Sequence, residues 1–124
     1  MERLTIEDLL LIAEAVLDVP GERLARVTRL AVAEAVLAAA ARRPTLAEHA
    51  AALCHRLVRE RPLPCGNKPV ALLAMLELVS RNHATWLPSS GGAMEVAMTI
   101  ERLASGELSD AAFTAWVRRH VADR

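Results

Sequence analysis

Residues 61–80 read Arg-Pro-Leu-Pro-Cys-Gly-Asn-Lys-Pro-Val-Ala-Leu-Leu-Ala-Met-Leu-Glu-Leu-Val-Ser, and this stretch decides the fold. A loop punctuated by Pro and Gly comes first, and a run follows that is apolar on almost every side. A helix without a polar face is normally a buried helix. We therefore predict that a helix over about residues 69–80 lies at the centre of the domain.

The start of this predicted helix has the features of an anion site. We predict Asn67 as the N-cap; Gly66 permits a close backbone approach, and Pro69 suits a first turn that needs no N–H. Free N–H groups and the positive end of the helix dipole favour an anion such as a phosphate. Lys68, the only lysine in the chain, adds an ammonium. The alternative is a capped, buried helix in which Lys68 is incidental.

The composition favours a single all-α domain of 124 residues, because Ala and Leu dominate and only three residues are aromatic. The formal net charge is zero and the charges are interspersed, which does not indicate a nucleic acid or a membrane surface as partner. Glu34 interrupts the longest apolar tract, so no run is long enough to cross a bilayer. The two cysteines, Cys54 and Cys65, are not at metal-binding spacing and favour a reduced, cytoplasmic setting.

Helical patterns account for the rest of the chain. Predicted helices cover about residues 6–17, 22–41 (as one helix or two), 45–60, 93–103 and a last segment that begins after residue 109. The predicted N-caps of the first, third and last of these helices are Thr5, Thr45 and Ser109. With the 69–80 helix they form a compact bundle of about six helices. The predicted inward-facing residues of the last two helices are Met94, Val96, Ala97, Ile100, Leu103, Phe113, Trp116, Val117 and Val121, with Arg118, Arg119 and Arg124 at the C-terminal end.

The stretch around residues 61–69 resembles the Fic/Doc (Fido) family. The family loop has the form H-x-F-x-(D/N)-(G/A)-N-(K/G)-R before an apolar central helix, and Gly66, Asn67 and Lys68 match it here. Residues 44–55 look like the helix before the motif, and residues 4–10 look like the family's start. Residues 104–109 resemble the close of the short Doc toxins. The resemblance implies one Fic/Doc-like domain over residues 1–124.

The departures from the family loop imply a degenerate active site. Arg61 stands where the family has its general base, and a guanidinium cannot accept a proton. Cys65 stands at the acidic, magnesium-holding position, where a neutral thiol is a poor ligand for a hard cation. Pro69 replaces a phosphate-clamping Arg, and Leu63 replaces a buried Phe. ATP or another nucleotide remains a candidate ligand of residues 66–68, magnesium has no suitable ligand, and we expect no metal site.

The resemblance raises two further points. Family members carry a β-hairpin flap that grips the target segment, and residues 22–44 show no pattern for one. His55 matches a family His one helix before the motif; we interpret it as a packed or hydrogen-bonded residue, although it could in principle replace the missing base. The other histidines show no metal spacing, and we expect Cys54 to be a small core residue. Trp86, in a loop over residues 86–92, is a predicted packing anchor.

Three functional hypotheses remain open. In the first, the chain is a Fic/Doc-like pseudoenzyme, related to toxin–antitoxin systems, that binds a nucleotide, a phosphorylated ligand or a protein partner. In the second, it is an active Doc-like toxin that transfers a phosphoryl or nucleotidyl group from ATP to a Ser/Thr hydroxyl of a target protein, and the resemblance then implies an antitoxin partner. In the third, Cys65 is a nucleophile, because a helix N-terminus, Arg61 and Lys68 favour its thiolate.

Overall fold

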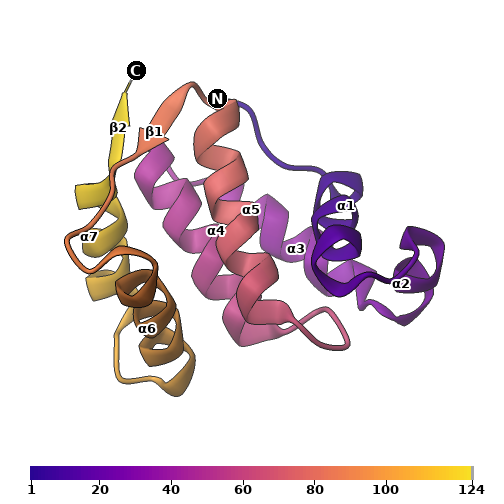
Figure 1. Cartoon of the computed structure of the whole chain (residues 1–124). Coiled ribbons are helices and arrows are strands. Elements are labelled where there is room, and N and C mark those ends of the chain that lie inside the picture. Colours follow the sequence, from indigo (N-terminus) through magenta and orange to yellow (C-terminus); the bar gives the residue numbers. More distant parts are fainter. Residues whose placement is uncertain (124) are drawn as a thin grey trace.

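Helices dominate the computed structural model, which describes residues 1–123, and three of them begin at a side-chain N-cap. The described part of the chain folds into seven helices and one two-stranded sheet (Figure 1). The elements are α1 Ile6–Leu17, α2 Gly21–Val27, α3 Leu30–Ala41, α4 Leu46–Glu60, α5 Asn67–Arg81, β1 Ala84–Trp86, α6 Gly92–Ser105, α7 Asp110–His120 and β2 Val121–Asp123. The all-α fold predicted from the sequence is confirmed.

The predicted caps of three helices are present. The side chains of Thr5, Thr45 and Ser109 each accept a hydrogen bond from the backbone N–H three residues further on, at 3.2, 3.2 and 3.1 Å. At α1 the Asp8 carboxylate in turn accepts a hydrogen bond from the Thr5 N–H, which completes a capping box. These bonds satisfy N–H groups that a helix leaves without an internal partner.

Residues 22–41, predicted to form one helix or two, form two helices that are separated at Thr28 and Arg29. Arg29, at this break, is hydrogen-bonded to the segment that leads into α5. Its backbone N–H donates to the Pro62 carbonyl at 2.9 Å, and its guanidinium donates to the carbonyls of Glu60 and Arg61. Residues 22–44 contain no β-hairpin, and α2 and α3 fill most of this segment.

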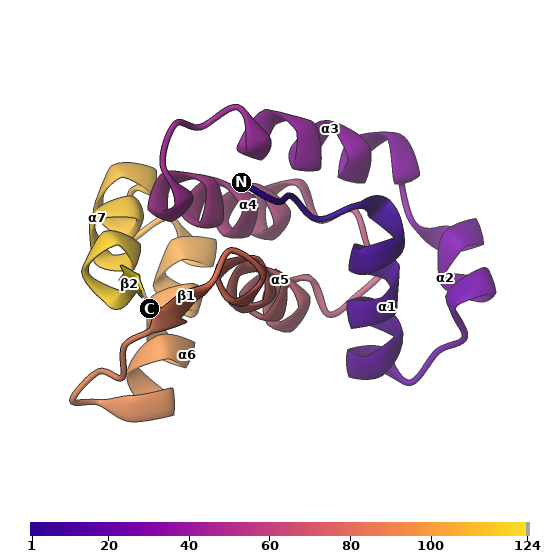
Figure 2. The same cartoon turned by 90° about the horizontal axis from the view of Figure 1, so that it is seen from above.

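The centre of the bundle is shared by α4 and α5. Helix α4 packs against α3, α5 and α7, and Figure 2 shows α3 and α5 on opposite sides of it. The small side chains of Ala50, Ala51 and Ala52 on α4 are buried and allow neighbouring helices to approach closely. Helix α5 also contacts α1 and α6, as expected of a central helix, but its Leu73 is exposed.

The predicted inward face of α6 is partly wrong. Ile100 and Leu103 are buried as predicted, whereas Met94 is 70% exposed, Ala97 is exposed and Val96 is only partly buried. The helix carries a second apolar stripe through Met94 and Met98, four residues apart, and periodicity alone cannot decide which stripe meets the core. In α7 the predicted core residues Phe113, Trp116 and Val117 are buried. Val121, predicted for the same helix, instead begins β2 and is half-buried, and Arg124 lies outside the described residues.

A short sheet, which the sequence did not predict, closes the C-terminal end. Strands β1 and β2 are antiparallel, with Trp86 opposite Val121. Trp86 stacks on His120 at a centroid distance of 5.0 Å and lies 5.3 Å from Trp116, so its predicted packing role is confirmed. Among residues 1–123, no helix has both the length and the apolar character needed to cross a membrane.

Candidate functional site

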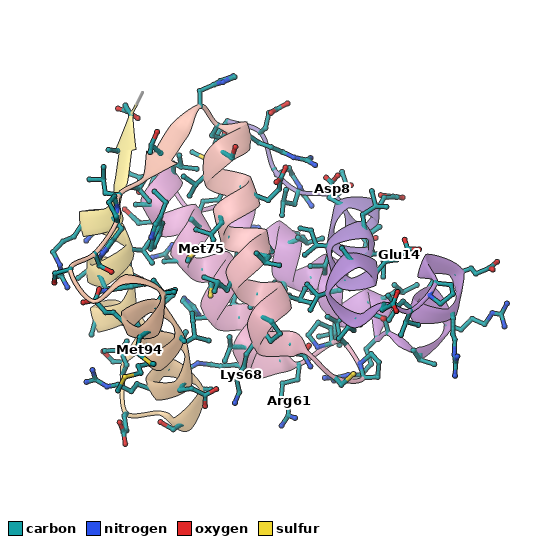
Figure 3. The ribbon with its side chains drawn as sticks, viewed as in Figure 1. Asp8, Glu14, Arg61, Lys68, Met75 and Met94 are labelled. Atoms are coloured by element: carbon teal, nitrogen blue, oxygen red, sulfur yellow. The ribbon has the colours of Figure 1, made fainter. Side chains whose placement is uncertain are left out.

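The loop from Arg61 to Gly66 connects the two central helices and holds the motif-like residues. It begins at Arg61, which has a left-handed backbone (φ 49°) and caps the C-terminus of α4. Figure 3 shows the side chains of Arg61 and Lys68 at the same end of the molecule, beside the start of α5. The fold therefore presents Arg61 to solvent near the first turn of a helix, but its guanidinium remains unable to act as a base.

Asn67 has a different role from the predicted N-cap. Gly66, with φ 70°, occupies the cap position, and Asn67 is the first helical residue. The Asn67 amide accepts a hydrogen bond from the Leu63 N–H and donates one to the Leu63 carbonyl, both at 3.0 Å. The residue is only 8% exposed. Its side chain therefore fixes the loop, and both of its polar atoms are already used.

Glycine at position 66 is favoured by its backbone conformation, and the packing around it also leaves little room for a side chain. A Cβ built at this position would lie 2.4 Å from Cδ2 of Leu17, the last residue of α1. The close approach expected at Gly66 is therefore an approach to α1. Leu63 is buried as well, so the loop is part of the packed structure.

Lys68 is paired with a carboxylate. Its Nζ lies 3.0 and 3.1 Å from the two carboxylate oxygens of Glu101 on α6. The two side chains are 47% and 65% exposed, so the pair contributes less than about 1 kcal/mol to stability and an anionic ligand can compete for the ammonium. A cavity of about 210 Å³ lies beside this pair, between α5 and α6.

The first turn of α5 offers few amide donors to an anion. Pro69 has no N–H, and the N–H of Val70 donates to the Gly66 carbonyl at 3.1 Å. The backbone N–H groups that remain for a ligand are those of Asn67 and Lys68. The predicted anion site at residues 66–68 is thus reduced to two N–H groups and one shared ammonium.

The two cysteines differ as the sequence predicted. Cys54 is fully buried in α4, and burial raises the pKa of its thiol far above the usual value. Cys65 is exposed in the loop and carries a free thiol. The structure thus gives the Cys65 sulfur the access to solvent that a nucleophile needs. Within residues 1–123, no three His, Cys, Asp or Glu side chains are grouped so that they could hold a metal ion.

A second candidate site lies between α4 and α7, and sequence reasoning missed it. A cavity of about 450 Å³ opens there, lined by Arg43, Ala52, His55, Arg56, Asp110, Ala111, Thr114 and Arg118. The His55 side chain is 13% exposed, and its Nδ1 lies 3.7 Å from Oδ2 of Asp110. The residues come from segments about 55 positions apart, so only the packing of α7 against α4 brings them together.

Burial determines the charge of His55. Loss of solvent lowers the pKa of the imidazole, Asp110 opposes this effect, and the guanidinium groups of Arg56, Arg59 and Arg43 add to it. The imidazole is therefore neutral at physiological pH. The packing role that the sequence favoured for His55 agrees with its burial, and its position in a cleft is the new finding.

Neither known protein families nor curated proteins gave a match to this chain. The likeness to the Fic/Doc family therefore depends on the residues of the loop and its flanking helices.

Proposed function

We propose that this chain is a degenerate Fic/Doc-like domain that acts by binding and does not transfer a phosphoryl or nucleotidyl group. The observation that carries the proposal is the state of the loop. Arg61 cannot serve as the base, Cys65 offers no carboxylate for magnesium, and the Asn67 amide is used to hold Leu63. A transferase of this type needs a base and charge stabilisation at the phosphates, and the loop supplies neither in full.

The Lys68–Glu101 pair is the feature of this loop best suited to binding. It is exposed, it borders a cavity, and an anionic ligand can replace the Glu101 carboxylate at little cost in stability. A nucleotide or phosphorylated ligand would use the ammonium and the N–H groups of Asn67 and Lys68. A protein partner, either an antitoxin or a target, would place an acidic side chain there.

The first test is expression in bacteria of the unchanged chain, of Lys68→Ala and of the control Arg23→Ala on the exposed face of α2. Growth is followed while lysates are incubated with radiolabelled ATP. We expect normal growth and no Lys68-dependent transfer of label to any protein. Growth arrest together with a labelled protein, both abolished by Lys68→Ala, would contradict the proposal and support an active Doc-like toxin.

A binding measurement completes the test. Isothermal titration of purified protein with ATP should show saturable binding that Lys68→Ala weakens and Cys65→Ser leaves unchanged. The affinity should be the same with and without a chelator, because the loop holds no metal ligand. If Cys65→Ser alone abolished an activity, the nucleophile hypothesis would replace this one.

A further inference from the structure

The cleft between α4 and α7 concentrates positive charge. Three guanidinium groups line it, those of Arg43, Arg56 and Arg118, and that of Arg59 lies beside it, paired with Asp110. Two carboxylates face them: Glu48 lies 3.6 Å from both Arg43 and Arg118, and Asp110 lies 2.5 Å from Arg59. Four cations against two anions leave this group of side chains with a charge of +2. Since the whole chain has a formal net charge of zero, the excess is local.

The pairing around Glu48 is incomplete. One carboxylate is shared by two guanidinium groups at 3.6 Å, a distance longer than a charge-assisted hydrogen bond. Arg56 lines the same cavity, and within the described residues it forms no ion pair. The arginines of the cleft therefore have donors available for a further anion.

His55, which lines the cleft, carries a polar atom without a partner. Nδ1 of His55 is shielded from solvent and has no hydrogen-bond partner, since the Asp110 oxygen nearest to it is 3.7 Å away. An unsatisfied buried polar atom destabilises the fold, and a ligand that supplies a hydrogen bond there offsets part of that loss. A ligand in the cleft that reaches His55 would supply the missing partner.

We propose that the cleft between α4 and α7 binds a phosphate monoester, with Arg43, Arg56 and Arg118 holding the phosphate. The forked guanidinium donors match phosphate oxygens, and a monoester carries a charge of about −1.5 to −2 at neutral pH, close to the +2 of the cleft. The cavity of about 450 Å³ exceeds the size of a phosphate ion and falls within the range of sites for small organic ligands. Ala52 and Ala111 provide apolar lining for the organic group.

This proposal does not depend on the Lys68 loop or on the Fic/Doc resemblance. The test is calorimetric titration of the full chain with O-phosphoserine, with adenosine monophosphate and with inorganic phosphate at constant ionic strength. We expect saturable 1:1 binding of at least one of the two esters. Arg56→Gln and Arg118→Gln should each weaken it by about tenfold, because each removes a charge-assisted contact. The control Arg23→Gln should leave the affinity unchanged, and binding at the cleft should persist in Lys68→Ala, which removes only ligand bound at the loop.

A second measurement uses the unchanged protein and so does not depend on any variant folding. The imidazole resonances of the four histidines are followed by NMR against pH, with and without the ester that binds. A bound dianion favours the imidazolium, so the His55 pKa should rise against the lowering caused by burial and by Arg43, Arg56 and Arg59. The other histidines should not respond.

Three results would overturn the proposal. The first is no saturable binding of either ester at millimolar concentration. The second is binding that is lost in Lys68→Ala but unchanged in the arginine variants, with no shift of the His55 resonances. Such a result would place the anion at the loop. The third is an equal affinity for inorganic phosphate and both esters, which would show an ion site that does not recognise an ester. Preference for phosphoserine or for adenosine monophosphate would identify the source of the phosphate as a modified protein or a nucleotide.

Discussion

Replacing Asn67 by Ala tests whether this side chain supports the loop or binds a ligand. In the structure the amide makes two hydrogen bonds of 3.0 Å to the backbone of Leu63, and both residues are buried. Alanine would remove both bonds and leave one N–H and one carbonyl without a partner inside the loop. If Asn67 instead faced an anion, as the sequence predicted, the substitution would weaken binding with little effect on stability.

The expected loss follows from the price of unpaired buried groups. Each lost bond contributes about 1 kcal/mol net, and an unsatisfied buried polar group costs about 1–3 kcal/mol. Partial relaxation of the loop toward water brings the total for Asn67→Ala to roughly 2–4 kcal/mol. For a domain of this length, that corresponds to a fall in Tm of roughly 6–20 °C.

The assay is thermal and urea unfolding, followed by circular dichroism, of Asn67→Ala beside Lys68→Ala. The control changes the adjacent residue, whose ion pair with Glu101 is exposed, so it should cost less than about 1 kcal/mol. Equal losses in the two variants, or a larger loss in Lys68→Ala, would refute the structural role of the Asn67 amide.

Three further predictions concern other parts of the chain. Alkylation of native protein should modify Cys65 and spare the buried Cys54, giving one adduct by intact mass before unfolding and two after it. Asp8→Asn should lower the free energy of unfolding by about 1 kcal/mol at neutral pH. The pKa of Asp8 is lowered mainly by the facing Arg81 guanidinium and also by the Thr5 hydrogen bonds, while burial opposes this shift. That stabilisation is present above about pH 4 and is lost as the pH falls, so urea unfolding near pH 3 should show a smaller difference from the unchanged protein. Gly66→Ala should cost about 1–2 kcal/mol more than Gly106→Ala; both have positive φ, but only the former would place a Cβ against another side chain.

Local signals in the sequence predicted most of the helices correctly. Capping by Thr5, Thr45 and Ser109 depends on contacts within one turn, so the residues themselves are enough to locate those helix starts. The same kind of rule misplaced the cap of α5. Asn is a good N-cap, but it can also bond to the backbone of a preceding loop, and the left-handed turn at Gly66 selected the second possibility.

Features that depend on contacts between distant segments were not predictable from the pattern alone. The Arg29 side chain holds the carbonyls of the loop more than thirty residues away. The cleft exists because His55 on α4 faces Asp110 on α7, and neither residue carries a local sign of that contact. The buried stripe of α6 was equally undetermined, since Met94 and Ile100 lie on alternative apolar faces of one helix.

Helix α6 is held to the rest of the molecule by few buried residues. Of its fourteen residues, only Thr99, Ile100 and Leu103 are buried, and both of its ends lie at glycines with positive φ, Gly92 and Gly106. Elements with so few buried contacts open locally at a free energy well below that of global unfolding. Glu101 moves with this helix. Opening of α6 would therefore release the Lys68 ammonium from Glu101, in addition to the direct competition by a ligand at this exposed pair.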